Sequence, residues 1–318
     1  MPTAFIFHPD HVLHHTGPFH PERPERIQAI LSHIEDEKSR EPGSPLHDLI
    51  HLEPVSADLS WIKTVHEPSY VDAVPGWCRQ SLRDLPTGDT TICQESYQAA
   101  LLTAGAGLAG VDAIIDGRMD NAFCCMRPPG HHAESNRGMG FCIFNNIAIA
   151  VRYAQQRHHA ERVVIIDWDV HHGNGTQQIF EEDPTVFYIS IHQSPHYPFT
   201  GLSGECGEGD GEGYTLNMPV AAGAGNEIYI NAFKDIVAPA VTRYDPDLVF
   251  LSAGFDAHCD DPLSGTTVTE EGFADMMQIV MDLADVLCES RLVSFLEGGY
   301  DLNALAQCVT EHIIMLTE

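Results

Sequence analysis

The chain has 318 residues, of which 43% are hydrophobic, and carries 46 acidic against 16 basic side chains, for a formal net charge of −30. This charge argues against direct binding to nucleic acid, and a solvated, highly soluble surface is its simplest explanation. The length suits a single α/β domain covering residues 1–318. We expect neither a membrane span nor a secretion signal, and therefore a cytoplasmic protein.

Strands and helices are predicted to alternate along the chain. Apolar runs bounded by Gly, Pro or polar residues predict strands at 3–7, 49–54, 121–126, from Val163, 185–192, 214–220, 248–256 and 292–300. Helical spacing predicts helices at 24–38, 57–66, 69–74, 94–117, 147–157, after Asn174, 226–242, 276–287 and at the C-terminus. This alternation predicts a parallel sheet covered by helices on both faces, with functional loops at the carboxyl ends of its strands.

Two long loops stand out. The segment 127–146 is rich in Pro and Gly between apolar flanks, and 194–213 is Gly-rich, so neither is expected to form regular structure. Loops of this kind carry function. The nine cysteines show no paired CxxC motifs, so no disulfide framework is expected, and Cys124, Cys125 and Cys142 are predicted to pack inside.

The stretch VVIIDWDVHHGNG, residues 163–175, carries the strongest chemical signal. Asp167, Asp169 and His171 alternate where an apolar strand ends, so their side chains are expected to project to one side. Carboxylate and imidazole ligands in this arrangement suit zinc and several other divalent ions. Asp256, which ends the apolar run DLVFLSAGFD, is the best candidate for a further ligand. Three protein ligands would leave coordination positions for water and substrate, as in catalytic zinc sites.

Five motifs occur in order along the chain: RPPGHHA (127–133), GFCIFNN (140–146), DWDVHHGNGT (167–176), SAGFDAH (252–258) and LEGGYD (296–301). Together they closely resemble the histone deacetylase family, in its class II-like bacterial branch, over nearly the whole chain. The resemblance implies the arginase/deacetylase fold and a hydrolase that acts on linear amides. It also assigns one catalytic Zn²⁺ ion to Asp169, His171 and Asp256.

The same resemblance places a pair of histidines beside the attacking water. It implies that His132 is the general base and that His131 is an electrostatic partner that stays protonated. Asp167 would orient His131, and Asn174 would orient His132. Many family members carry Asp at the position of Asn174, so His132 is expected to be less favoured as a cation in this chain.

Further residues are assigned to a substrate channel by the resemblance. Tyr300 follows a double glycine that lets its loop approach the metal, and its hydroxyl would donate to the developing oxyanion. Phe141 and Tyr197 would form the walls of a narrow channel for an extended acyl-amine, with Gly140 in contact with the substrate. Arg26 resembles the residue that lines the acetate exit path.

Family members also bind potassium near the sheet, so the resemblance implies two structural K⁺ sites, formed chiefly by backbone carbonyls. The residues around the first are Asp167, Asp169, His171 and Ser190, and those around the second are Phe180, Asp183, Val186 and Tyr214. A second catalytic metal, as in arginase-like enzymes, is not expected, because Gly173 and His258 occupy the positions of its ligands.

Some histidines and one glutamate have simpler interpretations. His20 and Glu22, in PFHPERPER, either rim the pocket or cap the following helix, and the sequence does not separate the two. The pairs His14–His15 and His158–His159 are interpreted as surface features.

The resulting prediction is a zinc amidohydrolase that removes acetyl, or a related short acyl group, from lysine side chains of proteins or peptides. The alternative substrate is an acetylpolyamine or another small N-acetyl amine. Polyamine-selective relatives carry an acidic residue where this chain has Leu263, which favours lysine, whereas the charge of −30 would attract polyamines. A non-catalytic module that only recognises acyl-lysine is disfavoured, since neither a zinc ligand nor Tyr300 is missing. The sequence leaves open the acyl length and whether the chain forms a homo-oligomer.

Overall fold

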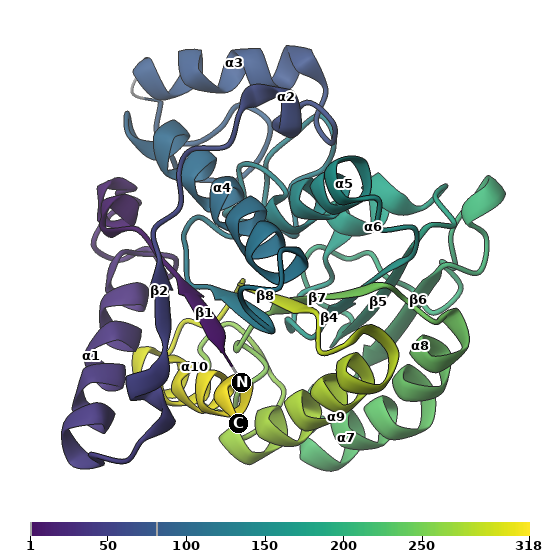
Figure 1. Cartoon of the computed structure of the whole chain (residues 1–318). Helices are drawn as coiled ribbons and strands as arrows, with labels where there is room; N and C mark the ends of the chain where they lie inside the picture. Colours follow the sequence, from purple (N-terminus) through teal and green to yellow (C-terminus); the bar gives the residue numbers. More distant parts are fainter. Residues whose placement is uncertain (1, 81) are drawn as a thin grey trace.

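Figure 1 shows the computed structural model of the chain, which describes residues 2–80 and 82–318. Within these residues eight strands form one sheet, in the order β2-β1-β3-β8-β7-β4-β5-β6, and all neighbours run parallel. The strands are β1 (Thr3–Ile6), β2 (Ile50–Leu52), β3 (Asn121–Cys124), β4 (Val163–Asp167), β5 (Val186–Gln193), β6 (Thr215–Val220), β7 (Leu248–Ala253) and β8 (Leu292–Leu296). The predicted α/β fold with one parallel sheet is confirmed.

The α-helices are α1 (Glu25–Arg40), α2 (Leu59–Ile62), α3 (Pro68–Arg79), α4 (Ser96–Ile115), α5 (Asn146–His158), α6 (Asn174–Phe180), α7 (Asn226–Ala232), α8 (Ala238–Tyr244), α9 (Glu270–Cys288) and α10 (Leu302–Thr317). Several boundaries differ from those predicted. Although proline disfavours a helix interior, α3 continues beyond Pro75, because Val74 and Cys78 extend its buried face. The helix predicted at 226–242 consists of α7 and α8 joined by a π-helical turn, Phe233–Val237.

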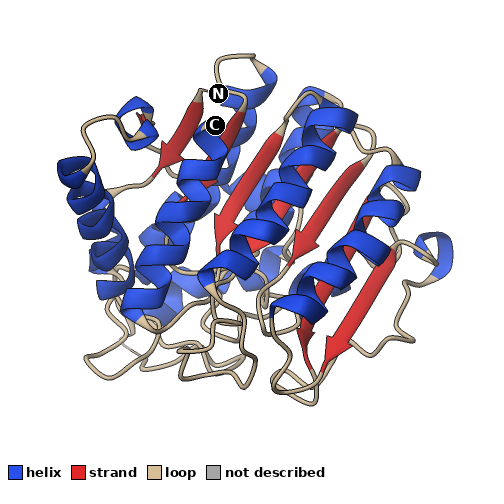
Figure 2. Ribbon diagram, turned by 90° about the horizontal axis from the view of Figure 1, so that it is seen from below, coloured by secondary structure: helices blue, strands red, loops and turns tan. Residues whose placement is uncertain are grey.

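Two apolar layers enclose the sheet. Along β4, Val163 and Ile165 belong to one buried cluster, and Val164 and Ile166 belong to the other, as the two-residue repeat of a strand requires. Helices α4 and α5 pack in the first layer, and α1, α9 and α10 pack in the second. Figure 2 shows helices on both sides of the sheet. The sheet is therefore buried on both faces, as its continuous apolar strands predict.

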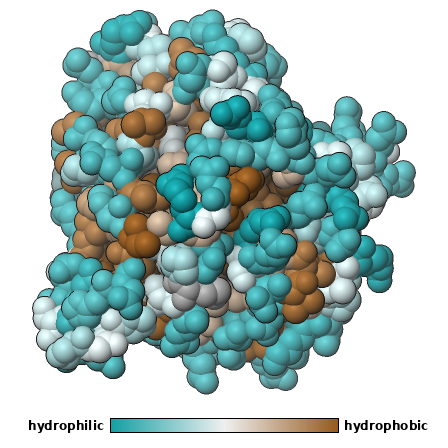
Figure 3. All heavy atoms as spheres, in the orientation of Figure 1, coloured by the Kyte–Doolittle hydropathy of each residue, from teal (hydrophilic) through white to brown (hydrophobic). Residues whose placement is uncertain are grey.

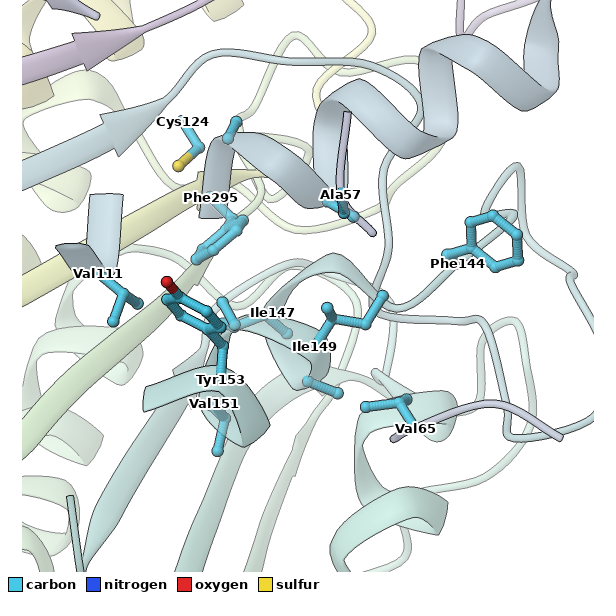
Figure 4. Packing of buried hydrophobic residues seen from close by; sticks show 14 of the residues in the cluster. Ala57, Val65, Val111, Cys124, Phe144, Ile147, Ile149, Val151, Tyr153 and Phe295 are labelled. Atoms are coloured by element: carbon cyan, nitrogen blue, oxygen red, sulfur yellow. The ribbon is translucent and has the colours of Figure 1, made fainter. Parts of the chain in front are cut away.

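Helix α4 is long and apolar enough to cross a membrane, by length and composition alone. However, 72% of its most apolar window is buried inside the structure, which is typical of a core helix. A Cβ atom at Gly107 would lie 2.8 Å from the ring of Phe295, so the small residue permits close packing on β8. Figure 4 shows Val111 of α4 and Val151 of α5 in the same layer as Phe295.

The carboxyl edge of the sheet collects the loops that follow the central strands. In Figure 2 the strand arrows point to the edge where long loops gather. Strand β7 lies between β4 and β8, with Ser252 opposite both Asp167 and Phe295. The segments after these three strands therefore emerge side by side. The molecular face shown in Figure 3 is mainly hydrophilic, with small apolar patches between polar side chains.

Candidate metal and catalytic site

Three buried side chains converge where β4 and β7 end. Asp169 and His171 follow β4, and Asp256 follows β7; all three are at least nine-tenths buried, and their ligand atoms lie within 4.8 Å of one another. The Nδ1 atom of His171 is 3.1 Å from Asp169 Oδ1 and 3.0 Å from Asp256 Oδ2. Two carboxylates and an imidazole at this spacing are a donor set for a divalent metal ion.

The backbone prepares the two carboxylates for such an ion. The second oxygen of Asp169 accepts the N–H of Gly298 at 2.7 Å, and that of Asp256 accepts the N–H of Val170 at 2.9 Å. A Cβ atom at Gly298 would overlap the Asp256 carboxylate, and one at Gly254 would overlap that of Asp169, so only glycine fits. Burial and the charge of Asp169 raise the pKa of Asp256 to about 7, so the ionised form of this carboxyl group is disfavoured. A bound cation would stabilise the ionised form. The residues therefore fit the predicted Zn²⁺ ion.

The predicted histidine pair lies beside this cluster. His131 and His132 follow β3 in the loop 127–146, and their ring centroids are 4.0 Å apart. His131 Nδ1 lies 3.1 Å from Asp167 Oδ2, while His132 Nδ1 lies 2.9 Å from Asn174 Oδ1. The Asn174 amide donates to Glu134 at 2.8 Å, which directs its oxygen toward His132. The Nδ1–H of His132 is therefore a donor, and its Nε2 is left as a base.

The two histidines have opposite electrostatic environments. Burial disfavours the charged form of His131, but Asp169, Asp167 and Glu297 outweigh it and raise its pKa to about 10. Burial lowers the pKa of His132 well below its ordinary value, and the neighbouring His131 lowers it further. His131 is accordingly an imidazolium and His132 a neutral imidazole at neutral pH, the division expected of a charged partner and a base.

Tyr300 lines the same cavity as His132. Gly299 before it adopts a φ of +119°, which favours glycine, and the N–H of Tyr300 donates to Asp261 at 2.7 Å. The guanidinium of Arg26 lies 5.1 Å from the centre of the Tyr300 ring. Burial raises the pKa of Tyr300 well above its ordinary value, so the phenol keeps its proton and is a hydrogen-bond donor.

A cavity of about 240 Å³ joins these groups to the surface, and its lining consists of Asp89, His132, Gly140, Phe141, His171, His196, Tyr197, Leu263 and Tyr300. It thus brings together all the residues predicted to bind substrate. A Cβ atom at Gly140 would overlap the ring of His132, and its φ is +56°, so the channel requires glycine there. Phe141 and Tyr300 meet edge to face at 6.0 Å.

Three residues at this site were not predicted from the sequence. Asp89 lines the channel, and its Oδ1 accepts the N–H of Gly140 at 2.7 Å. The ring of His196 stacks on His171 at 4.9 Å between centroids, and Glu297 accepts the backbone N–H of His131 at 3.2 Å. Glu297 stands inside the LEGGYD motif, which was the available signal. Asp89 and His196 belong to no recognised motif.

The residues with two interpretations are separated by the structure. His20 packs its ring on Phe141 at 4.7 Å, so it rims the channel. Glu22 neither rims the channel nor caps the helix, because it is fully buried and pairs with Arg127. His14 is fully buried as well, 3.4 Å from Glu22, so the interpretation of the pair His14–His15 as a surface feature is wrong for His14. The buried ion pair of Glu22 with Arg127 satisfies both charges, and His14 contacts the same carboxylate.

The residues predicted around potassium fall into two groups. Asp167 and Ser190 face each other across β4 and β5, with Asp169 and His171 just beyond β4. The second group closes the turn before β5: Asp183 N–H donates to Phe180 O at 2.9 Å, and Val186 N–H donates to Asp183 O at 3.3 Å. Tyr214 immediately precedes β6, which pairs with β5. Potassium binding itself stays a prediction.

The fold and this site define a parallel α/β protein with a metal-type ligand set and a histidine pair beside a cavity that His132 and His171 line. The model of the histone deacetylase domain matches residues 20–316. A probable deacetylase of Archaeoglobus fulgidus is 39% identical over 303 residues, covering 95% of this chain and 82% of the relative. The polyamine deacetylase HDAC10 of Homo sapiens is 37% identical over 324 residues, covering 97% of this chain and 47% of the relative.

The comparison with solved structures agrees with the comparison of sequences. The crystal structure of the HDA15 HD domain matches with a TM-score of 0.92 at 38% identity, covering 99% of this chain and 88% of that one. The chain therefore belongs to the histone deacetylase family, and it is a hydrolase of that family. The predicted arginase/deacetylase fold is confirmed.

Proposed function

We propose that this protein is a zinc-dependent deacetylase that removes acetyl, or a related short acyl group, from lysine side chains of proteins or peptides. The carrying observation is that His132, the phenol of Tyr300 and His171 of the ligand set line one cavity, and that Asp169 and Asp256 contact His171 directly behind it. A zinc ion held by the three ligands would supply Lewis acidity, which polarises a carbonyl group and lowers the pKa of water.

The chain's own residues then divide the proton chemistry. Neutral His132 offers Nε2 to take the proton of the attacking water, because its Nδ1–H is engaged by Asn174. Tyr300 donates to the carbonyl oxygen as it becomes an oxyanion, so its hydrogen bond is strongest in the transition state. The imidazolium of His131 lowers the cost of that negative charge, and His132, once protonated, returns the proton to the leaving amine.

The shape of the channel supports an acyl-lysine substrate. Phe141, Tyr197 and Leu263 line it with apolar surface, which suits the methylene chain of lysine. Next to the rim residues, Phe19 is 96% exposed and Phe199 is 78% exposed. Exposed aromatic side chains around a mouth are typical of a surface that contacts a polypeptide.

An acetylpolyamine substrate is the second candidate, and one observation favours it specifically. Asp89 places a carboxylate in the lining of the channel and is exposed, so it could pair with an ammonium group of a polyamine. The net charge of −30 would raise the local concentration of such cations. The human relative named as a polyamine deacetylase is in keeping with this alternative.

The deciding experiment compares kcat/KM of the zinc-loaded protein for acetyl-lysine peptides, longer acyl-lysine peptides and acetylated polyamines. We expect an acetyl-lysine peptide to be the best substrate. Asp89→Asn serves as the second arm: it should lower kcat/KM for a polyamine far more than for an acetyl-lysine peptide if the carboxylate binds an ammonium group. A higher kcat/KM for polyamines, together with a selective loss of polyamine turnover in Asp89→Asn, would replace the proposal by the alternative. Zinc binding without any turnover would indicate a recognition module.

We also propose that the two groups of backbone and side-chain oxygens beside β4 and β5 bind K⁺ and stabilise the fold. Replacing K⁺ by a larger organic cation at equal ionic strength should then lower the thermal midpoint of unfolding. An unchanged midpoint would contradict these sites. A cytoplasmic location remains a prediction.

A further inference from the structure

Glu297 is a buried carboxyl group that takes no direct part in the proposed proton chemistry, although its charge contributes to the raised pKa of His131. It directly follows β8 and is 1% exposed. Its Oε2 accepts the backbone N–H of Gly130 at 2.7 Å and that of His131 at 3.2 Å. Its Oε1 accepts the hydroxyl of Ser252, at the end of β7, at 3.4 Å. A single side chain thus connects the histidine loop to the ends of two central strands.

The backbone of Glu297 and of the two glycines after it forms hydrogen bonds with Arg26 and Asp169. Its carbonyl oxygen accepts one N–H of Arg26 at 2.6 Å, and the carbonyl of Gly299 accepts another at 2.6 Å. The N–H of Gly298 donates to the metal ligand Asp169 at 2.7 Å. Tyr300 follows directly. The segment 297–300 therefore fixes the position of the Tyr300 phenol and of the Asp169 carboxylate. The side chain of Glu297 connects the histidine loop to that same segment by hydrogen bonds.

We propose that Glu297 is a positioning residue, whose carboxyl oxygen holds the loop of His131 and His132 at the correct distance from Tyr300 and the metal ligands. This inference rests on the proposed function, because positioning matters only where base, phenol and ligands act on one substrate. The positioning role requires an acceptor oxygen at the place of Oε2 and not a negative charge, because Asp169 and Asp167, which raise the pKa of His131 more than Glu297 does, remain in place. Burial raises the pKa of Glu297 to about 7, which agrees with a role that does not depend on full ionisation.

Three substitutions separate position from charge. Glu297→Gln keeps an acceptor oxygen within reach of Gly130 and His131 and can direct its amide to Ser252, but it carries no charge. Glu297→Asp keeps the charge and withdraws it by one C–C bond, about 1.5 Å. Glu297→Ala removes the acceptor. A displacement of about 1 Å at a catalytic centre costs on the order of 100-fold in rate.

The experiment measures kcat, KM and bound zinc for these variants with an acetyl-lysine peptide. We expect Asp and Ala to lower kcat by ~100-fold with KM within ~3-fold and zinc at the wild-type ratio, and Gln to remain within ~5-fold. Glu271→Ala, at an exposed position of α9, is the control for the substitution itself and should match the wild type. If the Ala variant fails to fold, the Gln and Asp pair still decides the question.

Each other outcome overturns the inference. An active Asp variant with an inactive Gln variant would mean that Glu297 acts through its charge. Wild-type rates in all three would remove any role, and loss of zinc in proportion to activity would make Glu297 a support of the metal ligands. A wild-type protein that hydrolyses no N-acetyl amine would instead refute the proposed function, so the two failures are distinguishable.

Discussion

Tyr300→Phe isolates a single hydrogen bond in the proposed chemistry. The ring is held by Arg26 at 5.1 Å and by the edge contact with Phe141 at 6.0 Å, and a phenylalanine keeps both contacts. Only the hydroxyl is lost. Because burial raises the pKa of Tyr300 well above its ordinary value, that hydroxyl is a neutral donor across the working pH range. The variant therefore lacks one donor to the oxyanion and is otherwise unchanged.

The expected magnitude follows from this geometry. Removing one donor of an oxyanion hole costs ~100-fold to ~1000-fold in kcat, or about 2.7–4 kcal/mol of transition-state stabilisation. The amide carbonyl of the substrate carries only partial charge, so KM should change little. Zinc content should be unaffected, since Tyr300 is not one of the three ligands.

The assay is steady-state hydrolysis of an acetyl-lysine peptide by zinc-loaded protein, with metal content measured on the same samples. Tyr244→Phe is the matched control: its hydroxyl donates to Pro184 at 3.3 Å, in the part of the fold where α8 packs near β5, so kcat should equal the wild-type value. Near wild-type turnover of Tyr300→Phe, or a loss confined to KM, would show that the tyrosine is a channel wall and that its hydroxyl does not stabilise the oxyanion.

Three further predictions concern the base, the metal and the pH dependence of stability. His132→Ala should lower kcat by ~100-fold or more with zinc retained, measured by the same assay, and a small effect would transfer the role of base to His131. Asp256→Ala should lose bound zinc and activity together, as measured by metal analysis, because two protein ligands hold the ion weakly; full zinc occupancy would mean that the ligand is misassigned. Burial lowers the pKa of His312 in the folded state to about 3, whereas its pKa in the unfolded state is ~6.5. As the pH falls below 6.5, the unfolded state therefore binds a proton that the folded state does not, and the free energy of unfolding decreases. His312→Phe should therefore lose ~2 kcal/mol less unfolding free energy between pH 7 and pH 5 than the wild type in urea titrations, and equal losses would contradict the assignment.

The sequence predicted the strands and the ligands for the same physical reason. Apolar runs such as Val163–Asp167 are buried on both faces, so they are continuous, and the polar ligands begin where burial by the two helical layers ends. Helix ends were predicted less well. Pro75 signals a helix end locally, yet the packing of Val74 and Cys78 outweighs that signal in α3. Local patterns thus predict elements, whereas their boundaries depend on tertiary packing.

The residues that sequence reasoning missed share a different property, which is that their partners are remote in the chain. Asp89 accepts from Gly140, 51 positions away, and Glu297 accepts from Gly130, 167 positions away. Apart from the LEGGYD motif around Glu297, no local pattern distinguishes such a carboxyl group from a solvated one, because its contacts form only when parallel strands bring their carboxyl ends together. Glu22 makes the same point: it lies within a charged stretch of sequence, and only the fold shows that it is buried against Arg127. Candidate metal ligands can thus be predicted from the ends of single strands, while remote partners such as those of Glu297 require the order of strands in the sheet.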